Sequence, residues 1–580
     1  MLIQNGLFGA SCHRAHFEVP PQYGVPHPNR CGSHGTRLRP CLAIVPKHIL
    51  THRCDTLHDI CSRHRLPAKA KIPCHKRICL LSAFQDARTL PQDTILTPDL
   101  AIVGGGPAGI GLALALADSG LNILLLESGG RTFEANVQKL YEGSQTGVPY
   151  VALDGGRLRF LGGSTNHWGG WTRPLDRIDF ENRKGMAHFG WPFARGAIEP
   201  YFARAQALIE AGPWIYDEAD KTASDSGPLL RLGPGGLYTS WFQFSKTRDG
   251  NLPTHFGDRY QADLGRAPRI MPLLHANVTA IRLSPDAARV MQLDVATLSG
   301  NRLTVKPRYT VLAAGAIENA RLMLASGDVM TAGVGNGNDL VGRFFADHPI
   351  PRDVATLVLF DGQIAPFYFN NLTLPNGAVM RAALSPRPEF MRARGVAGSL
   401  TTFENETKLD PFATAAVVTT AQALGVDASN ARAYSLGCGM ELAPDPDRRL
   451  TLGSERDALG MPKLNLHMTI ADSDFEHFRH TLTELGRQLL AAKSGMIHLS
   501  YNRRDEWLAA MDWGNHHLGT TRMHDDPKQG VVDATSKVHG IGNLYVAGSS
   551  VFPTYGSSNP TLNLVALTLR LADHLKKVMA

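Results

Sequence analysis

The chain has 580 residues, of which 43% are hydrophobic and 19% are charged, as in a globular enzyme with two or three domains. The net charge of +7 comes from residues 1–93, which hold 13 Lys and Arg against 5 Asp and Glu, so we expect no nucleic-acid-binding face on the remainder. No apolar run reaches the ~18–20 residues that a bilayer-spanning helix needs, so the sequence predicts no transmembrane helix.

Residues 1–80 hold seven of the eight Cys and nine of the 23 His. A zinc module is one interpretation, but no Cys-x2-Cys or His-x3-His spacing recurs. A targeting peptide is another, but the pattern of a signal peptide is missing and the Pro, His and Cys content is wrong for an amphipathic helix. We favour a disordered extension that is not part of the working protein, with the body beginning near Leu81 or Phe84. Without an export signal we expect a cytoplasmic location, or a periplasmic one only if a partner subunit carries the chain across.

The first predicted elements of the body are a strand over residues 99–103 and a buried helix over residues 107–117. The turn between them reads G-x-G-x-x-G, with Gly104, Gly106 and Gly109. The first glycine allows a tight turn, the second lets the backbone approach a pyrophosphate, and the third lets the helix pack on the strand. The free N–H groups at the helix start would bind the phosphates.

A second strand is predicted over residues 122–126 and ends at Glu127. This acid follows Gly109 by 18 residues, close to the ~20 typical of the carboxylate that binds ribose hydroxyls. The unit therefore predicts a Rossmann-type α/β domain that binds an adenine dinucleotide. It does not decide between NAD and FAD.

Residues 161–170 form a glycine-rich loop that contains Gly163, Ser164, Asn166 and His167. Glycine pairs around small polar residues suit a backbone that passes close to a planar cofactor. We therefore expect this loop beside the cofactor, where the neighbouring tryptophans could shield its ring.

The last predicted elements are a strand over residues 541–547 and a helix over residues 562–578. Residues 515–522 carry two histidines, Gly548 and Ser549 end the strand, and Asn559 precedes the helix. Flavin-dependent alcohol oxidation needs a base for the hydroxyl proton and a polar group that orients the oxygen. A neutral histidine suits the first task and an amide the second.

These segments together resemble the glucose–methanol–choline (GMC) oxidoreductase family, nearest to its pyranose oxidase and glucoside 3-dehydrogenase branch. Residues 275–278, 311–321 and 342–349 also match, and the resemblance covers residues 84–580. It implies a Rossmann-type FAD-binding domain, like that of p-hydroxybenzoate hydroxylase, and a substrate domain of a β-sheet plus helices. We expect the FAD domain over residues 84–350 and 510–580, and the substrate domain over residues 350–510.

The resemblance implies FAD as the cofactor. It extends the expected cofactor-binding residues to Gly104, Gly106, Gly109, Glu127, Gly163, Ser164, Asn166, His167, Val278, Gly548, Ser549 and Thr561. Pyranose oxidases link their flavin covalently through a histidine of this loop, and the resemblance places that histidine at His167 of this chain. Because Asn166 stands where those oxidases carry Thr, we favour noncovalent FAD over a link through His167.

The family pattern His-x-x-Gly-Thr falls on His516, and its His-or-Asn partner position falls on Asn559. The resemblance thus implies that His516 is the base and that Asn559 orients the substrate. His517 is the rival base. If the segment is extended, neighbouring side chains point to opposite faces, so we expect His517 to be a packing residue. We expect no metal site in residues 84–580.

We therefore predict an FAD-dependent oxidoreductase that acts on the CH–OH group of a sugar or glycoside, with hydride passing to the flavin and His516 as base. The alternatives are an FAD-containing lyase and a non-catalytic flavoprotein subunit of the same fold. Oxygen, quinone and a cytochrome all stay open as electron acceptors, and a small partner subunit is compatible with the branch. Because that branch passes electrons to a partner, we expect faster turnover with a dye than with air.

Overall fold

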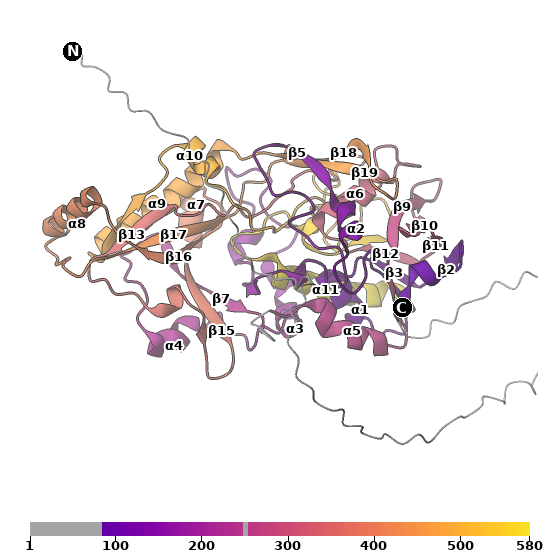
Figure 1. Cartoon of the computed structure of the whole chain (residues 1–580), viewed down its shortest axis with the longest axis horizontal. Helices are drawn as coiled ribbons and strands as arrows, with labels where there is room; N and C mark the ends of the chain where they lie inside the picture. Colours follow the sequence, from indigo (N-terminus) through magenta and orange to yellow (C-terminus); the bar gives the residue numbers. More distant parts are fainter. Residues whose placement is uncertain (1–83, 247–252) are drawn as a thin grey trace, which may run out of the picture. The chain divides into compact units, whose positions relative to one another are not determined.

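The computed structural model describes residues 84–246 and 253–580 (Figure 1), so our predictions for residues 1–80 lie outside the described residues. The strands of the described part form four sheets. Among its helices, none is long and apolar enough to cross a membrane.

A six-stranded parallel sheet positions the nucleotide-binding turn. Its order is β1 (Gln85–Asp86), β8 (Ile270–Leu274), β4 (Ile123–Leu126), β3 (Leu100–Val103), β12 (Tyr309–Leu312) and β21 (Leu544–Val546). Every residue of β3 and β4 is buried, as expected for parallel strands that are covered on both faces. Helices α1 (Pro107–Ala115) and α11 (Pro560–Met579) pack against each other beside this sheet.

The predicted β-α-β unit is confirmed by β3, α1 and β4, and the predicted strand over residues 541–547 by β21. His275 adopts a left-handed φ of 54°, and this turn separates β8 from β9 (Asn277–Leu283), which lies in another sheet.

Two smaller sheets flank the nucleotide-binding region. The four-stranded sheet has the order β2 (Thr94–Leu96), β11 (Arg302–Val305), β10 (Val290–Ala296) and β9. The three-stranded sheet has the order β18 (Arg449–Arg456), β19 (Pro462–Met468) and β5 (Gly143–Gly147).

An eight-stranded antiparallel sheet lies to the left of the parallel sheet in Figure 1. Its order is β20 (Gly495–Leu499), β13 (Ala355–Leu359), β17 (Arg432–Met440), β16 (Ser399–Thr407), β15 (Val379–Pro386), β7 (Leu237–Phe244) and β6 (Trp171–Thr172), with β14 (Leu372–Thr373) paired to β15. Helix α9 (Asp472–Ala491) packs on β20. Because β6 and β7 precede residue 350, this sheet is not confined to residues 350–510, and the domain boundaries stay a prediction.

The remaining α-helices of the described residues are shorter than α9 and α11. They are α2 (Ala135–Gln138), α3 (Phe202–Leu208), α4 (Ala219–Ala223), α5 (Phe256–Arg266), α6 (Ala316–Ala325), α7 (Pro388–Arg394), α8 (Pro411–Leu424) and α10 (Arg504–Ala509). Of these, α6 matters most for the site, because it follows β12 directly.

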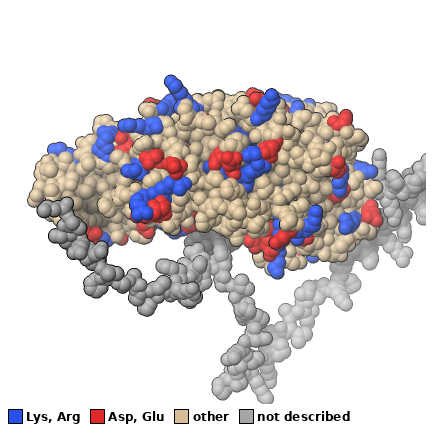
Figure 2. Space-filling model, turned by 90° about the horizontal axis from the view of Figure 1, so that it is seen from above, with Lys and Arg blue, Asp and Glu red and all other residues tan. Residues whose placement is uncertain are grey.

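Charged side chains are interspersed on the face drawn in Figure 2, where basic and acidic residues alternate without an extended area of one sign. This distribution agrees with the near-neutral charge of the residues that follow the N-terminal segment.

Candidate active site

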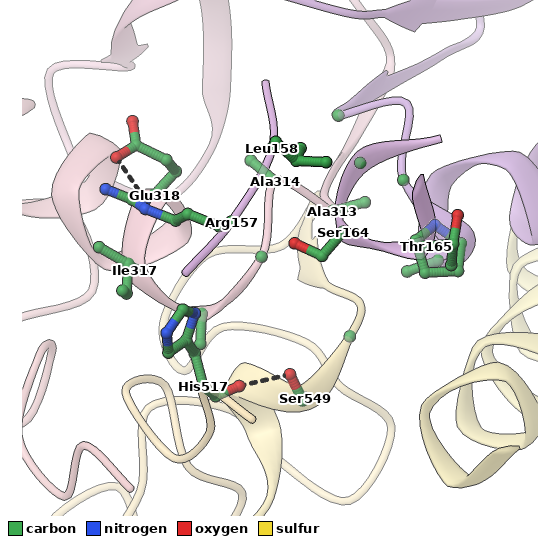
Figure 3. A pocket seen from close by; sticks show the side chains of 18 of the residues that line it. Arg157, Leu158, Ser164, Thr165, Ala313, Ala314, Ile317, Glu318, His517 and Ser549 are labelled. Atoms are coloured by element: carbon green, nitrogen blue, oxygen red, sulfur yellow. Dashed lines mark hydrogen bonds and ion pairs between the residues drawn. The ribbon is translucent and has the colours of Figure 1, made fainter. Parts of the chain in front are cut away.

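A deep pocket opens at the carboxyl ends of β3, β4 and β12, where the N-terminus of α1 also lies. Ligands of open α/β sheets bind at this edge. The glycine-rich loop and the C-terminal segment complete the wall, so residues from across the chain converge there (Figure 3).

The nucleotide-binding turn has the steric requirements that its glycines predict. Gly104 has a φ of 115°, and a Cβ atom on it would meet the carbonyl oxygen of Ala313 at 2.5 Å. A Cβ on Gly109 would lie 1.9 Å from the carbonyl oxygen of Gly104, so this glycine lets α1 pack on the turn. A Cβ on Gly106 would meet no protein atom within 4 Å, and Gly106 lines the pocket. The turn therefore leaves open space where a pyrophosphate would lie.

Glu127 lines the pocket at the end of β4, as predicted, and its carboxylate also holds the turn. Its Oε2 accepts the N–H of Gly105 at 2.8 Å, and its Oε1 accepts the N–H of Gly129 at 2.8 Å. This side chain thus has a structural task besides the predicted ribose contact.

The glycine-rich loop contains the 3-10 helix η3 (Gly163–Asn166). Gly163, Ser164 and His167 line the pocket. Asn166, in contrast, is not among the lining residues, because its amide donates a hydrogen bond to the carbonyl of Leu161 at 3.0 Å. The expectation that Asn166 contacts the cofactor is therefore not supported by its position. The predicted residues that line the pocket are Gly104, Gly106, Glu127, Gly163, Ser164, His167, Val278, His516, Gly548, Ser549, Asn559 and Thr561.

A buried ionic cluster on the pocket wall was not predicted from the sequence. Arg157 and Arg159 bind the carboxylate of Glu318 at 2.9 and 3.2 Å, and Arg321 lies 3.4 Å from it (Figure 3 shows the Arg157 contact). Burial alone would raise the pKa of Glu318, but the three guanidinium groups lower it to about 2. The buried Nε of Arg159 has no hydrogen-bond partner among the described residues. Arg157 and Arg159 line the pocket, and together with the unsatisfied buried donor they fit an anionic dinucleotide there.

The first functional pair joins two segments of the C-terminal region. The Nε2 atom of His516 lies 3.2 Å from the Nδ2 atom of Asn559, and both residues line the pocket. Asn559 is the N-cap of α11, and no side chain caps this helix start. The positive end of the α11 dipole therefore faces the pocket, next to the lining residue Thr561, where it would stabilise developing negative charge.

Behind this pair lies a buried aspartate. Oδ1 of Asp347 accepts the backbone N–H groups of His516 at 2.6 Å and His348 at 2.7 Å, and its Oδ2 accepts the hydroxyl of Tyr150 at 2.5 Å. Burial raises the pKa of Asp347 to about 7, against the lowering effect of these hydrogen bonds. The Asp347 side chain thus holds the backbone of the proposed base and that of His348.

The same region brings together three groups of the kind that bind metals. The side-chain donor atoms of Asp347, His348 and His516 lie within 4.8 Å of one another. The Nδ1 atoms of the two histidines face each other at 2.9 Å, the spacing of a hydrogen bond. The prediction of no metal site stays a prediction.

His517 also lines the pocket, which differs from the expectation that only one of the two histidines reaches it. The segment is not a regular extended strand, because Asn515 and Gly519 have left-handed φ values of 56° and 82°. The His517 ring packs near Tyr150 and Phe345, with ring centroids 6.3 and 5.9 Å away. Its backbone carbonyl accepts the Ser549 hydroxyl at 2.7 Å (Figure 3).

Burial keeps the histidines of the site neutral. It lowers the pKa of His516 well below its ordinary value, and the neighbouring His348 and His517 add to this effect. Burial also lowers the pKa of His348 to about 4 and that of His517 to about 3. A neutral imidazole at position 516 can accept a proton at physiological pH.

The family described as GMC oxidoreductase matches residues 444–568. The chain is 28% identical to C-glycoside 3-oxidase of Microbacterium trichothecenolyticum, over 74% of this chain and 77% of that protein. It is 24% identical to 2-methyl-1,2-propanediol dehydrogenase of Mycolicibacterium austroafricanum over 83% and 95% of the two chains. It is 23% identical to the fructose dehydrogenase large subunit of Gluconobacter japonicus over 82% and 97%.

Among solved structures, formate oxidase from Aspergillus oryzae RIB40 superimposes with a TM-score of 0.52 at 18% identity, covering 85% of this chain and all of that chain. Pyridoxine 4-oxidase from Mesorbium loti gives a TM-score of 0.52 at 19% identity, covering 82% and 98% of the two chains. These likenesses show a shared fold.

The dinucleotide turn, the arginines of the pocket wall and the His516–Asn559 pair fit an FAD-dependent oxidoreductase. Residues 444–568 match the GMC oxidoreductase family, in agreement with the resemblance, and the chain is an oxidoreductase that acts on CH–OH groups.

Proposed function

We propose that this enzyme oxidises a ring hydroxyl of a sugar or glycoside, with His516 as the base and Asn559 as the orienting group. The observation that carries the proposal is the 3.2 Å contact between His516 Nε2 and Asn559 Nδ2 inside the cofactor pocket. A substrate hydroxyl that replaces this direct contact could donate its hydrogen to Nε2 and accept a hydrogen bond from Nδ2.

FAD, when bound, accepts the hydride that leaves the substrate carbon. His516 removes the hydroxyl proton, since its imidazole is neutral at physiological pH. Asn559 holds the oxygen and thereby fixes the direction of the C–H bond. Trp168 and Trp171 line the same pocket and limit access of water to the reacting groups.

The substrate class rests on the relatives. C-glycoside 3-oxidase and the fructose dehydrogenase large subunit are named for sugar and glycoside substrates, whereas 2-methyl-1,2-propanediol dehydrogenase is named for a small diol. A pyranose ring presents its C–H bond rigidly, so a histidine–amide pair suffices for orientation. We therefore favour a sugar or glycoside over an open-chain alcohol.

We propose that the FAD is held noncovalently. His167 lines the pocket, but Asn166, which occupies the position of a Thr in the covalent oxidases, is turned toward Leu161. Acid precipitation should release the flavin into the supernatant. Flavin that stays with the precipitated protein, and that a His167→Ala substitution releases, would show a covalent link.

We also propose that electrons pass to a partner rather than efficiently to oxygen. One relative is named as the large subunit of an enzyme, which supports a small subunit or cytochrome partner. Turnover with a dye or quinone should exceed turnover in air. Peroxide production at the rate seen with the dye would contradict this part of the proposal.

The deciding experiment mixes purified enzyme anaerobically with a panel of pyranoses, glucosides and short diols. A sugar or glycoside should bleach the yellow flavin, and the diols should do so more slowly. Protein that binds FAD but is bleached by no alcohol would favour an FAD-containing lyase or a non-catalytic subunit. A colourless protein that binds no flavin would overturn the whole assignment.

A further inference from the structure

The imidazole of His348 lies directly behind the proposed base and takes no part in the chemistry described above. It is buried, with 3% of its surface exposed, and it follows the aspartate that holds the backbone of His516. Its Nδ1 lies 2.9 Å from Nδ1 of His516, and its Nε2 lies 2.9 Å from the backbone carbonyl of Gly556. The two rings meet edge to face, with centroids 5.0 Å apart.

The carbonyl of Gly556 determines which nitrogen of His348 carries hydrogen. A carbonyl oxygen can only accept, so Nε2 of His348 must be the protonated nitrogen. Because burial lowers the pKa of His348 to about 4, the ring is neutral at physiological pH and its Nδ1 has a free lone pair. The facing Nδ1 of His516 must then be the donor across the 2.9 Å contact.

We infer that His348 is a positioning residue that fixes the tautomer of His516, with hydrogen on Nδ1 and the lone pair of Nε2 directed at the substrate. This inference rests on the proposed role of His516 as the base. In the opposite tautomer, Nε2 would carry hydrogen and could not accept the hydroxyl proton. Before substrate binds, Asn559 reinforces the same state, since its Nδ2 can donate to an unprotonated Nε2 at 3.2 Å.

The carbonyl of Gly556, which accepts the hydrogen bond from His348, is itself held rigidly. Gly556 has a left-handed φ of 53°, and a Cβ atom on it would lie 2.5 Å from a carboxylate oxygen of Asp179. Oε1 of the buried Glu441 accepts the N–H groups of Tyr555 at 2.8 Å and Gly556 at 3.0 Å. The Gly556 carbonyl therefore cannot rotate easily, and the direction of both imidazole hydrogen bonds follows from the backbone.

The direction of the hydrogen bond from His516 to His348 also suits the state that follows proton transfer. When His516 accepts a proton at Nε2, the substrate O–H bond breaks, an Nε2–H bond forms, and the ring becomes positively charged. Its Nδ1–H then donates more strongly to the neutral His348, which shares the charge in a buried site. The neighbouring ionisable groups are Asp347, Glu441 and His517, and of these Glu441 favours positive charge on His348.

The test begins with nitrogen NMR of histidine-labelled, FAD-loaded full-length protein. The His516 signals, assigned by their loss in His516→Ala, should show a protonated Nδ1 and an unprotonated Nε2. In His348→Leu, which removes the acceptor while keeping the bulk, a substantial fraction of His516 should shift to the Nε2-protonated form. A wild-type His516 that carries its hydrogen on Nε2 would overturn the inference, whatever the activity.

Kinetics of a matched pair of variants provide the second readout. His348→Leu should lower kcat by ~10²-fold or more while FAD content is retained and KM changes less than about tenfold. His348→Asn keeps a carbonyl acceptor near the position of Nδ1 and should recover at least a tenth of the wild-type kcat. Equal losses in the Leu and Asn variants would contradict the inference. Full activity of His516→Ala would instead defeat the proposed function and leave the NMR result standing.

Discussion

The Nε2 atom of His516 lies 3.2 Å from the side-chain amide nitrogen of Asn559, although 43 residues separate them in the chain. The fold brings them together because Leu518 pairs with Ala346 as an isolated β-bridge, while Asn559 begins α11 beside the cofactor turn. The pair therefore places the proposed base and the group that orients the substrate next to each other in the pocket.

Three glycines of α1 and its turn should respond differently to alanine. Gly109→Ala places Cβ 1.9 Å from the carbonyl oxygen of Gly104 and should destabilise the fold. Gly106→Ala meets no protein atom within 4 Å but enters the cofactor pocket, so it should lower FAD content with little change in the stability of the apoprotein. Gly111→Ala meets nothing within 4 Å and should be neutral or stabilise the helix by up to ~1 kcal/mol.

Thermal unfolding of the apoproteins and flavin absorbance after reconstitution measure these effects separately. A Gly106→Ala protein that keeps its full FAD content would show that the cofactor does not approach this turn. A Gly111→Ala protein as unstable as Gly109→Ala would contradict the steric argument.

Substitution of Glu127 should affect both the cofactor and the fold. Glu127→Ala leaves the buried N–H groups of Gly105 and Gly129 without their carboxylate acceptor, at ~1–3 kcal/mol each. Glu127→Gln keeps one acceptor oxygen and should lose less stability. Apoprotein melting temperatures and FAD dissociation constants would rank the variants; an Ala variant of wild-type stability would show that the turn does not need these bonds.

Replacing Asn559 with Asp should move the acid limb of the pH–rate profile. In the wild type the base must be unprotonated, and its pKa lies well below the ordinary value, so kcat/KM should fall only at a pH well below ~6.5. The carboxylate of Asn559→Asp would favour the imidazolium form of His516 and raise its pKa, so activity should be lost at a higher pH.

Asn559→Ala is the control, since it removes the amide without adding charge. It should lower kcat while leaving the acid limb near its wild-type position. An identical pH profile in the Asp and Ala variants would show that His516 does not control the acid limb.

Much of the fold could be predicted from the sequence because its signals are local. The runs that became β3 and β4, and the glycines between β3 and α1, specify strand, turn and helix within a few residues. The break between β8 and β9 could not be predicted from the sequence, because it depends on the left-handed φ of His275, a conformation that is uncommon outside glycine.

The site was predicted where family patterns fall on particular residues and missed where it depends on tertiary contacts. His516 and Asn559 were chosen from such patterns. His348 lies 168 residues from His516, and the Glu318 carboxylate gathers arginines from positions 157, 159 and 321, so no sequence spacing reports either cluster. Asn166 was assigned to the cofactor from its place in a glycine-rich loop, but its bond to Leu161 could be seen only in three dimensions.

The central claim is that His516, and not its neighbour, removes the hydroxyl proton. Both histidines line the pocket, but His516 contacts Asn559, whereas His517 packs near Tyr150 and Phe345. The most direct measurement is the anaerobic rate of flavin bleaching by a sugar substrate in His516→Ala and His517→Ala, each with its FAD content verified. His516→Ala should be slower than wild type by ~10²–10⁴-fold, and His517→Ala by less than about tenfold. Rapid bleaching in His516→Ala together with a large loss in His517→Ala would contradict the account and make His517 the base.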